Sequence, residues 1–208
     1  MIEPFIGQDG RAFFAAAAFV FTLAAFAPYL RNVLAWRTRP QRASWFIWSV
    51  LSGVSFLGQL AEGASSSLVF AGAQWGGTVL VLLLSISRGV GGSLRGPDRL
   101  ILLAALAGIV VWSMTKDATW ALIISCSVSF LGGTATIAKA RLDPGSETFS
   151  FWVLSFLAAC CGMVSVGGWD PVLLLFPGHL ALMYFCVVAV ILLGRRGPAA
   201  PRPPAAGA

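Results

Sequence analysis

Seven apolar runs, each close to the length of a membrane-spanning helix, constrain this chain more than any other feature. A helix needs about 20 residues to cross the roughly 30 Å hydrocarbon core of a bilayer. Open strand edges would leave backbone groups unpaired in lipid, so runs of this kind form helices. We therefore predict an all-α membrane protein with seven transmembrane helices. The runs cover residues 12–36, 44–61, 67–87, 99–115, 118–138, 148–167 and 171–194.

The composition indicates lipid rather than water around the chain. Of the 208 residues, 58% are hydrophobic and only 11% are charged, whereas about 25% of the residues in a typical soluble domain are charged. The net charge of +6 lies in short clusters between the apolar runs, and a nucleic-acid-binding face would gather it into one patch. We expect the lipid bilayer, and no nucleic acid, as a partner. The tail at 195–208 is rich in proline and alanine, which predicts a disordered segment.

Basic residues are confined to alternate connections. Twelve of the 14 Lys and Arg residues fall on the odd-numbered connections and the C-terminal tail, and the other two are Arg11 and Lys116. Cytoplasmic loops of membrane proteins carry such an excess of positive charge. The split predicts a multi-pass plasma-membrane protein with its N-terminus outside and its C-terminus in the cytoplasm.

A shift of 104 residues superposes the two ends of the chain without a gap. Because the shift carries the first three runs onto the last three, it predicts two parallel three-helix bundles, at 12–87 and 118–194. A linker at 88–117, with one helix, joins them. Transporters use such repeats and bind the substrate between them. The matched pairs are Arg37 with Arg141, Pro40 with Pro144, Ser44 with Thr148, Trp48 with Trp152, Gly58 with Gly162 and Gly63 with Gly167.

Few side chains inside the runs suit catalysis. His179 is the only histidine, and the acidic residues fall at the ends of the runs or in the connections. A membrane enzyme needs paired carboxylates, a metal site or a nucleophile beside a base, so we expect no enzyme, no metal and no cofactor. Coupled carriers usually need a buried carboxylate, so the pattern favours facilitated diffusion. The cysteines lack disulfide or zinc spacing and predict packing; they are Cys126, Cys160, Cys161 and Cys186.

One stretch carries a family resemblance. It consists of the segment from Phe26-Ala-Pro28 to Asn32, the basic turn Arg37-Thr-Arg39, and Ser44. This stretch resembles the SWEET and PQ-loop (MtN3-like) transporter superfamily, in a bacterial-looking form. The resemblance implies a three-one-three plan of helices with an external N-terminus. It also implies a hinge at Pro28, because a proline removes one backbone hydrogen bond and permits a bend. Gly132 and Gly133 occupy the hinge position of the second bundle.

Polar side chains at mid-membrane depth are candidate solute ligands, because burying them without a role is unfavourable. Gln74 and Trp75 lie in the third run, and the shift matches them with Gly178 and His179 of the seventh. SWEET-like transporters carry an asparagine on each of these two helices to bind sugar hydroxyls. The resemblance implies that Gln74 and Gly178 stand at these positions. Gln74 and His179 would then bind the solute asymmetrically.

Further candidates lie on the other runs. Trp48 and Trp152 offer stacking surfaces for a planar or sugar-like ligand, and their place early in each run fits an interfacial aromatic anchor equally well. Asn32, near the hinge, is a candidate for an inner gate. Small polar residues are candidates either for lining a cavity or for packing helices together. They are Ser52, Ser55, Gln59 and Ser127.

These features predict a transporter that moves a small neutral polar solute, sugar-like or similar, by alternating access and facilitated diffusion. One alternative is a proton-coupled amino-acid or vitamin transporter of the same fold. Asp143 resembles the acidic residue by the second loop of some lysosomal relatives, His179 can titrate, and Trp45 with Trp48 is similar to the paired tryptophans of nicotinamide riboside carriers. The other alternative is a non-transporting receptor or assembly protein. Self-association into a homo-oligomer stays open.

Overall fold

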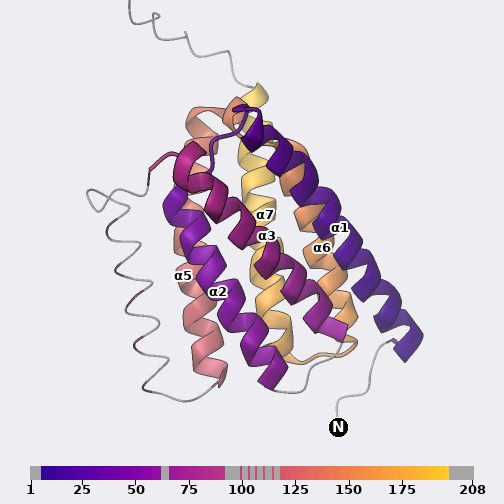
Figure 1. Cartoon of the computed structure of the whole chain (residues 1–208). Helices are drawn as coiled ribbons and strands as arrows, with labels where there is room; N and C mark the ends of the chain where they lie inside the picture. Colours follow the sequence, from indigo (N-terminus) through magenta and orange to yellow (C-terminus); the bar gives the residue numbers. More distant parts are fainter. Residues whose placement is uncertain are drawn as a thin grey trace, which may run out of the picture.

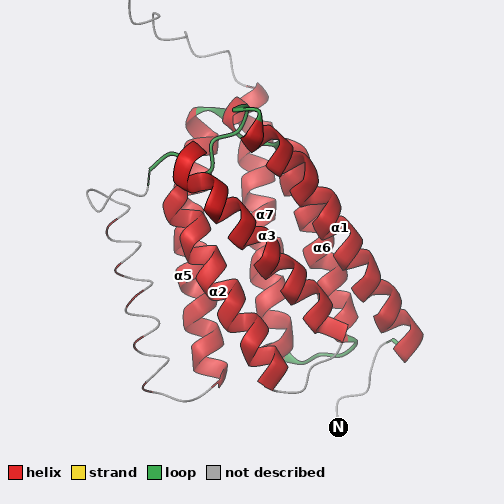
Figure 2. Ribbon diagram, viewed as in Figure 1, coloured by secondary structure: helices red, strands yellow, loops and turns green. Residues whose placement is uncertain are grey.

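The computed structural model describes residues 6–61, 66–91 and 118–196, with five single positions between 99 and 114. Within these residues the chain forms six α-helices, and the predicted all-α class is confirmed (Figure 2). The helices, labelled as in Figure 1, are α1 (Gln8–Leu34), α2 (Arg42–Ala61), α3 (Ser66–Arg88), α5 (Ala118–Leu142), α6 (Phe149–Val166) and α7 (Pro171–Arg196). A short 3-10 helix, Pro144–Ser146, lies between α5 and α6.

Six of the seven predicted apolar runs coincide with these helices to within a few residues. The run predicted at 99–115 lies outside the described residues, apart from single positions, as does nearly all of the tail predicted at 195–208. Four stretches are long and apolar enough to cross a membrane: Gln8–Leu34, Leu68–Arg88, Phe149–Val166 and Leu173–Gly194. They indicate a multi-pass membrane protein. Several of their large apolar side chains are more than half exposed, as lipid-facing residues would be, among them Phe13, Val20, Leu83, Ile86, Phe185 and Leu193.

Local sequence signals set the break between α6 and α7. Gly167 ends α6 in the left-handed conformation, with φ of +76°, and its N–H donates to the Val164 carbonyl. Glycine reaches this conformation without strain, which is why it so often ends a helix. Asp170 then accepts a hydrogen bond from the backbone N–H of Leu173 (3.1 Å), and Pro171 opens α7. An acidic side chain before a proline is a typical helix start.

The six helices close into a ring. Successive neighbours in the ring are α1, α3, α2, α5, α7 and α6, and α6 packs against α1 to complete it; Figure 1 shows α3 and α7 in the middle of the view with the others around them. Exchanging α1, α2 and α3 for α5, α6 and α7 converts every contact of the ring into another contact of the ring. The helix packing therefore has an approximate twofold relation between the two halves of the chain.

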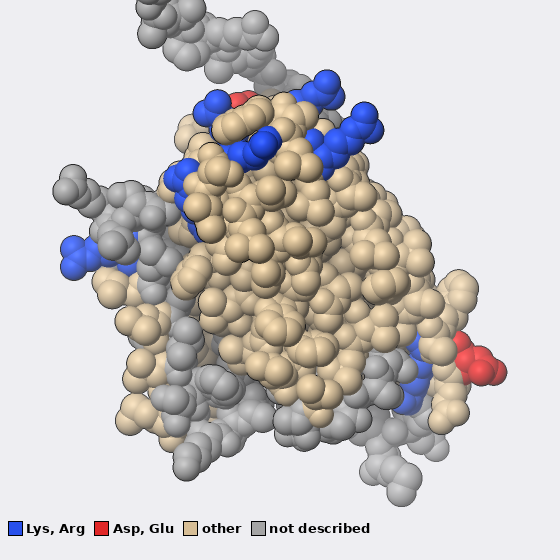
Figure 3. Space-filling view, viewed as in Figure 1, with Lys and Arg blue, Asp and Glu red and all other residues tan. Residues whose placement is uncertain are grey.

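Basic residues gather at one end of this ring, which we call the basic end (Figure 3). There Arg42, at the start of α2, donates to the Ser85 carbonyl of α3, and Lys139, near the end of α5, donates to the Arg39 carbonyl. Arg11 lies at the opposite end, against the end of α6. Helices α3 and α5 thus both end at the basic end, so the chain between them connects the two ends of the bundle. The basic end carries Arg31, Arg37, Arg39, Arg42, Arg88, Lys139 and Arg141.

Close packing between α1 and α3 depends on Gly77. A Cβ atom added to Gly77 would overlap the ring of Phe26, whereas a Cβ added to the neighbouring Gly76 meets no atom within 4 Å. Phe26 is almost fully buried, at 5% exposure, so its ring has little room to move away. The contact fixes how near α1 and α3 approach at the centre of the ring.

Gly77→Ala should therefore destabilise the protein by about 1–3 kcal/mol, the usual cost of forcing an extra carbon into a packed interior. The matched control, Gly76→Ala, adds the same methyl one residue away in open space and should leave stability unchanged or slightly higher. Thermal unfolding of both variants in detergent measures the difference. Equal unfolding temperatures for the two variants would show that α1 and α3 do not pack in this way.

Candidate functional site

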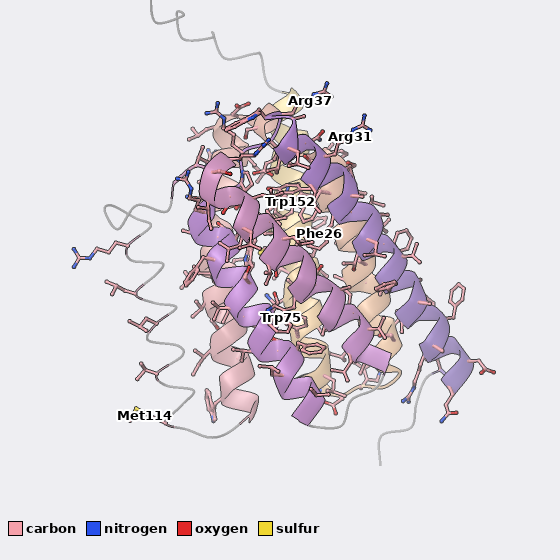
Figure 4. All side chains as sticks on the ribbon, in the orientation of Figure 1. Phe26, Arg31, Arg37, Trp75, Met114 and Trp152 are labelled. Carbon is pink, nitrogen blue, oxygen red and sulfur yellow. The ribbon has the colours of Figure 1, made fainter. Side chains whose placement is uncertain are left out.

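A cavity at the centre of the ring is lined by side chains from all six described helices. Figure 4 shows two of them, Phe26 of α1 and Trp152 of α6, inside the ring. The centre of a water molecule can occupy about 20 Å³ of this space, which is close to the room that one buried water needs. The space left between the lining side chains is therefore small. Its lining consists of Phe26, Trp45, Trp48, Leu51, Ser52, Gln74, Thr78, Ser129, Phe151, Trp152, Phe176, Leu180 and Tyr184.

Aromatic rings form most of the cavity wall. Trp48 and Trp152, which the shift of 104 residues relates, meet edge to face with ring centres 6.1 Å apart. Trp45 packs on Trp48 at 5.1 Å, and Phe151 packs on Trp152 at 4.9 Å. The quadrupoles of the aromatic rings make this edge-to-face packing favourable. Both central tryptophans are buried, so the interfacial position considered from the sequence does not apply to them; Trp120, in contrast, is 57% exposed.

Hydrogen bonds hold the two central indoles in place. The Trp48 Nε1–H donates to the Ser129 carbonyl of α5 at 3.1 Å. The Trp152 Nε1–H donates to the Glu147 carboxylate at 3.2 Å. Because an indole N–H is a donor only, each bond uses the whole polar capacity of its ring. The aromatic faces remain as the surfaces available to a ligand.

Gln74 and Tyr184 form the main polar pair of the cavity. The Gln74 amide donates to the Tyr184 hydroxyl, joining α3 to α7, and both side chains are buried. This bond does not use the O–H of Tyr184, which is a donor, or the side-chain carbonyl oxygen of Gln74, which is an acceptor. The pair therefore still offers at least one donor and one acceptor to a solute.

His179 stands one layer behind the cavity wall. Its Nδ1 lies 2.7 Å from the Phe176 carbonyl, and its Nε2 lies 3.0 Å from the hydroxyl of Ser129, which lines the cavity. A carbonyl only accepts, so in the neutral imidazole Nδ1 carries the proton and Nε2 accepts from Ser129. His179 thus orients a lining hydroxyl and does not itself line the cavity.

Two of the predicted ligands lie away from the cavity. Trp75 stacks on Phe56 of α2, with ring centres 5.5 Å apart, and is not a lining residue. Gly178 is also absent from the lining. The side chain that pairs with Gln74 is Tyr184 and not His179, which the sequence suggested. Of the small polar candidates, Ser52 lines the cavity whereas Ser55 and Ser127 do not; the Gln59 side chain lies outside the described residues.

Two equivalent hydrogen bonds join the halves of the chain near the basic end. The Asn32 amide of α1 donates to the Thr148 hydroxyl at the start of α6, at 3.1 Å. The Thr136 hydroxyl of α5 donates to the Ser44 hydroxyl of α2, also at 3.1 Å. In the repeat with a shift of 104 residues, Asn32 is equivalent to Thr136 and Ser44 is equivalent to Thr148. The same contact is therefore made twice. Asn32 lies in this interface and not in the cavity.

The predicted hinge residues lie within unbroken helices. Helix α1 runs through Pro28, and α5 runs through Gly132 and Gly133. The Gly132 carbonyl accepts a hydrogen bond from the Ser44 hydroxyl at 2.7 Å. A Cβ added to Gly133 would lie 2.7 Å from the Met183 sulfur. In this conformation the glycine pair allows close packing of α5 against α2 and α7.

Glu147 is the residue whose surroundings differ most from the prediction. It lies in the connection between α5 and α6, as expected, but it is buried, with 5% exposure, and pairs with Lys139 at 2.7 Å. Burial raises the pKa of Glu147 above its ordinary value, and the Lys139 charge opposes this effect. Sequence reasoning also missed Tyr184, although it is one of only two tyrosines and lies within the last apolar run.

Comparisons with protein-family models, with curated proteins and with solved structures found no match to this chain. The resemblance to SWEET and PQ-loop transporters therefore rests on the residues quoted above and stays a prediction.

Tyr184→Phe should destabilise the protein by about 1–3 kcal/mol, because it leaves the buried Gln74 amide without its acceptor. Adding Gln74→Leu removes the unpaired group, so the double variant should lose less than the sum of the single losses. Equilibrium unfolding of the four proteins gives the interaction energy, expected at about 0.5–3 kcal/mol. Strictly additive losses would show that the two side chains do not pair.

Proposed function

We propose that this chain is a membrane transporter that moves a small neutral polar solute by alternating access. The observation that carries the proposal is the central cavity, to which every described helix contributes. Transporters built from repeats bind their solute at such an interface between halves. In the present case Trp48 and Trp152, equivalent residues of the two halves, meet in the cavity wall.

The packing of the helices supports a three-one-three plan. The ring of contacts is unchanged when the first three helices are exchanged for the last three, and the Asn32–Thr148 and Thr136–Ser44 bonds are equivalent under the same exchange. Both observations favour two parallel bundles, at 12–87 and 118–194. Helix α3 ends at the basic end of the bundle, and α5 begins at the opposite end. A linker helix that crosses the membrane between them would connect these two ends, as the SWEET resemblance implies.

The lining favours an uncharged solute. Among the described residues that line the cavity, none is Asp, Glu, Lys, Arg or His. The polar residues of the lining are Ser52, Gln74, Thr78, Ser129 and Tyr184. A charged solute in this cavity would have no counter-charge to offset its desolvation free energy. The aromatic faces suit stacking against a flat or ring-shaped molecule, and the Gln74–Tyr184 pair offers it a hydrogen-bond donor and acceptor. A sugar-like solute meets these conditions.

Alternating access would open the ring at one end while the other stays closed. The halves meet where α1 packs on α6 and α2 packs on α5, so these two interfaces must part. Pro28 and Gly132, equivalent under the shift, are positions where α1 and α5 bend most readily. The excess of Lys and Arg favours a basic end on the cytoplasmic side of the plasma membrane, with the N-terminus outside. Asn32 and Ser44 then belong to the inner gate.

Uptake of a radiolabelled panel of sugars, amino acids and vitamins into proteoliposomes tests the proposal. We expect saturable uptake of an uncharged member of the panel without an ion gradient. Gln74→Ala and Trp48→Phe should each lower uptake at least about tenfold, the effect of losing one good hydrogen bond or ring contact. The exposed Trp120→Phe is the matched control and should transport normally.

Two outcomes would overturn the proposal. Vesicles that contain folded protein but take up none of the solutes would favour a receptor or assembly protein, particularly if a protein partner binds. Normal uptake by both cavity variants would show that the solute passes elsewhere.

A further inference from the structure

Glu147 is an acidic side chain held in an almost closed environment beside the cavity. Its side chain is 1% exposed, and its two carboxylate oxygens have different partners. Oε1 lies 2.7 Å from the Lys139 ammonium, and Oε2 accepts the indole N–H of Trp152 at 3.2 Å. A buried carboxylate is costly to keep charged unless it is paired. Its charge therefore depends on Lys139.

Lys139 joins Glu147 to the other half of the chain. Its ammonium also donates to the Arg39 carbonyl, in the connection between α1 and α2. The Lys139 ammonium thus links the α1–α2 connection, through Arg39, to the α5–α6 connection, through Glu147, at the basic end. The lysine side chain is 17% exposed, so it can reach water if its partner is lost.

Trp152 joins the same carboxylate to the cavity. Its ring lines the cavity and packs against Trp48, Phe151 and Tyr184, with ring centres 4.9–6.1 Å apart. Tyr184 is in turn the acceptor of Gln74. A change at Glu147 therefore reaches the main polar pair of the cavity through a single intervening ring.

We propose that Glu147 is a proton-binding site that couples protonation at the basic end to the cavity through Trp152 and Lys139. When Glu147 is ionised, it holds Lys139 across the two connections and keeps the basic end closed. When Glu147 takes a proton, its ion pair is lost and Lys139 can turn toward water. The neutral carboxyl can still accept the Trp152 N–H, but the connections are no longer tied by charge. As far as solute movement is concerned, this inference rests on the proposed function.

The charged and titratable groups that face Glu147 are few. Among the described residues, Lys139 of α5 acts on it directly, and Tyr29 of α1 is near enough to interact electrostatically. The 3-10 helix Pro144–Ser146 contributes no charged side chain, and Trp152 is the contact from α6. Asp143, the acid favoured from the sequence, is exposed and accepts the Gly145 backbone N–H. The proposed proton site is accordingly Glu147.

The direction of the pH effect follows from burial. Because the pKa of Glu147 is raised above 4.5, the folded chain binds this proton more tightly than the unfolded chain does. Its contribution to stability is then present below about pH 4.5 and is lost as the pH rises through the raised value. Solute uptake should change in the same interval, and it should be faster when Glu147 is protonated.

Tryptophan fluorescence of the full chain in lipid nanodiscs, titrated with acid, tests the proton site without any solute. The wild type should show one transition with a midpoint above pH 4.5, and both Glu147→Gln and Trp152→Phe should abolish it. Asp143→Asn is the matched control, since asparagine retains the turn hydrogen bond, and it should keep the transition. Lys139→Met removes the cation that favours the ionised form, so the midpoint should rise by about one unit or more.

The outcomes are decisive even for a variant that fails to fold. An unchanged transition in Glu147→Gln, or an unmoved midpoint in Lys139→Met, would overturn the proton site; a purely structural role for Lys139 would not move the midpoint. If Glu147→Gln does not fold, Lys139→Met alone decides. Uptake provides the second readout: wild-type uptake should rise as the pH falls, and Glu147→Gln should be fast at every pH. A normal titration with no uptake of any solute would refute the proposed function and leave the proton site standing.

Discussion

The ring of helices depends on two interfaces, α1 against α6 and α2 against α5, which carry most of the helix packing between the two halves of the chain. Each interface buries small polar groups that must find partners away from water. Asn32 with Thr148, and Thr136 with Ser44, provide these partners in equivalent ways. Hydrogen bonds between small side chains can separate and re-form at modest cost, unlike a packed apolar core. In the proposed transport cycle, these are the hydrogen bonds that would separate when the ring opens.

The cavity wall combines rigidity with few polar groups. Trp48 and Trp152 are held by their indole N–H bonds and by packing against neighbouring aromatic rings. The acidic side chain nearest to the cavity stands behind this wall, and its charge is balanced by Lys139. The two proposals therefore assign solute binding and proton binding to different residues, with Trp152 in contact with both sites.

Much of the architecture followed from the sequence, because lipid imposes a strict length and polarity on each helix. The repeat also indicated that Trp48 and Trp152 would be equivalent, and the structure brings them together. The repeat did not predict the partner of Gln74, since Tyr184 has a leucine, Leu80, at its equivalent position. Hydropathy likewise could not place Glu147, whose burial depends on how the two connections fold over each other. Trp75 was misplaced because an aromatic residue at mid-helix suits a helix interface as well as a cavity.

The most direct test of the account is a reversible lock on the opening of the ring. In a variant without the four native cysteines, Ser44→Cys on α2 and Thr136→Cys on α5 place two sulfur atoms near the positions of hydroxyl oxygens that now lie 3.1 Å apart, so that a small adjustment brings them to disulfide geometry. Uptake into proteoliposomes is then measured before oxidation, after oxidation and after reduction. The account predicts that oxidation stops uptake and that reduction restores it. Full uptake by the oxidised protein, with the disulfide verified, would contradict the claim that the halves of the ring must part at the basic end.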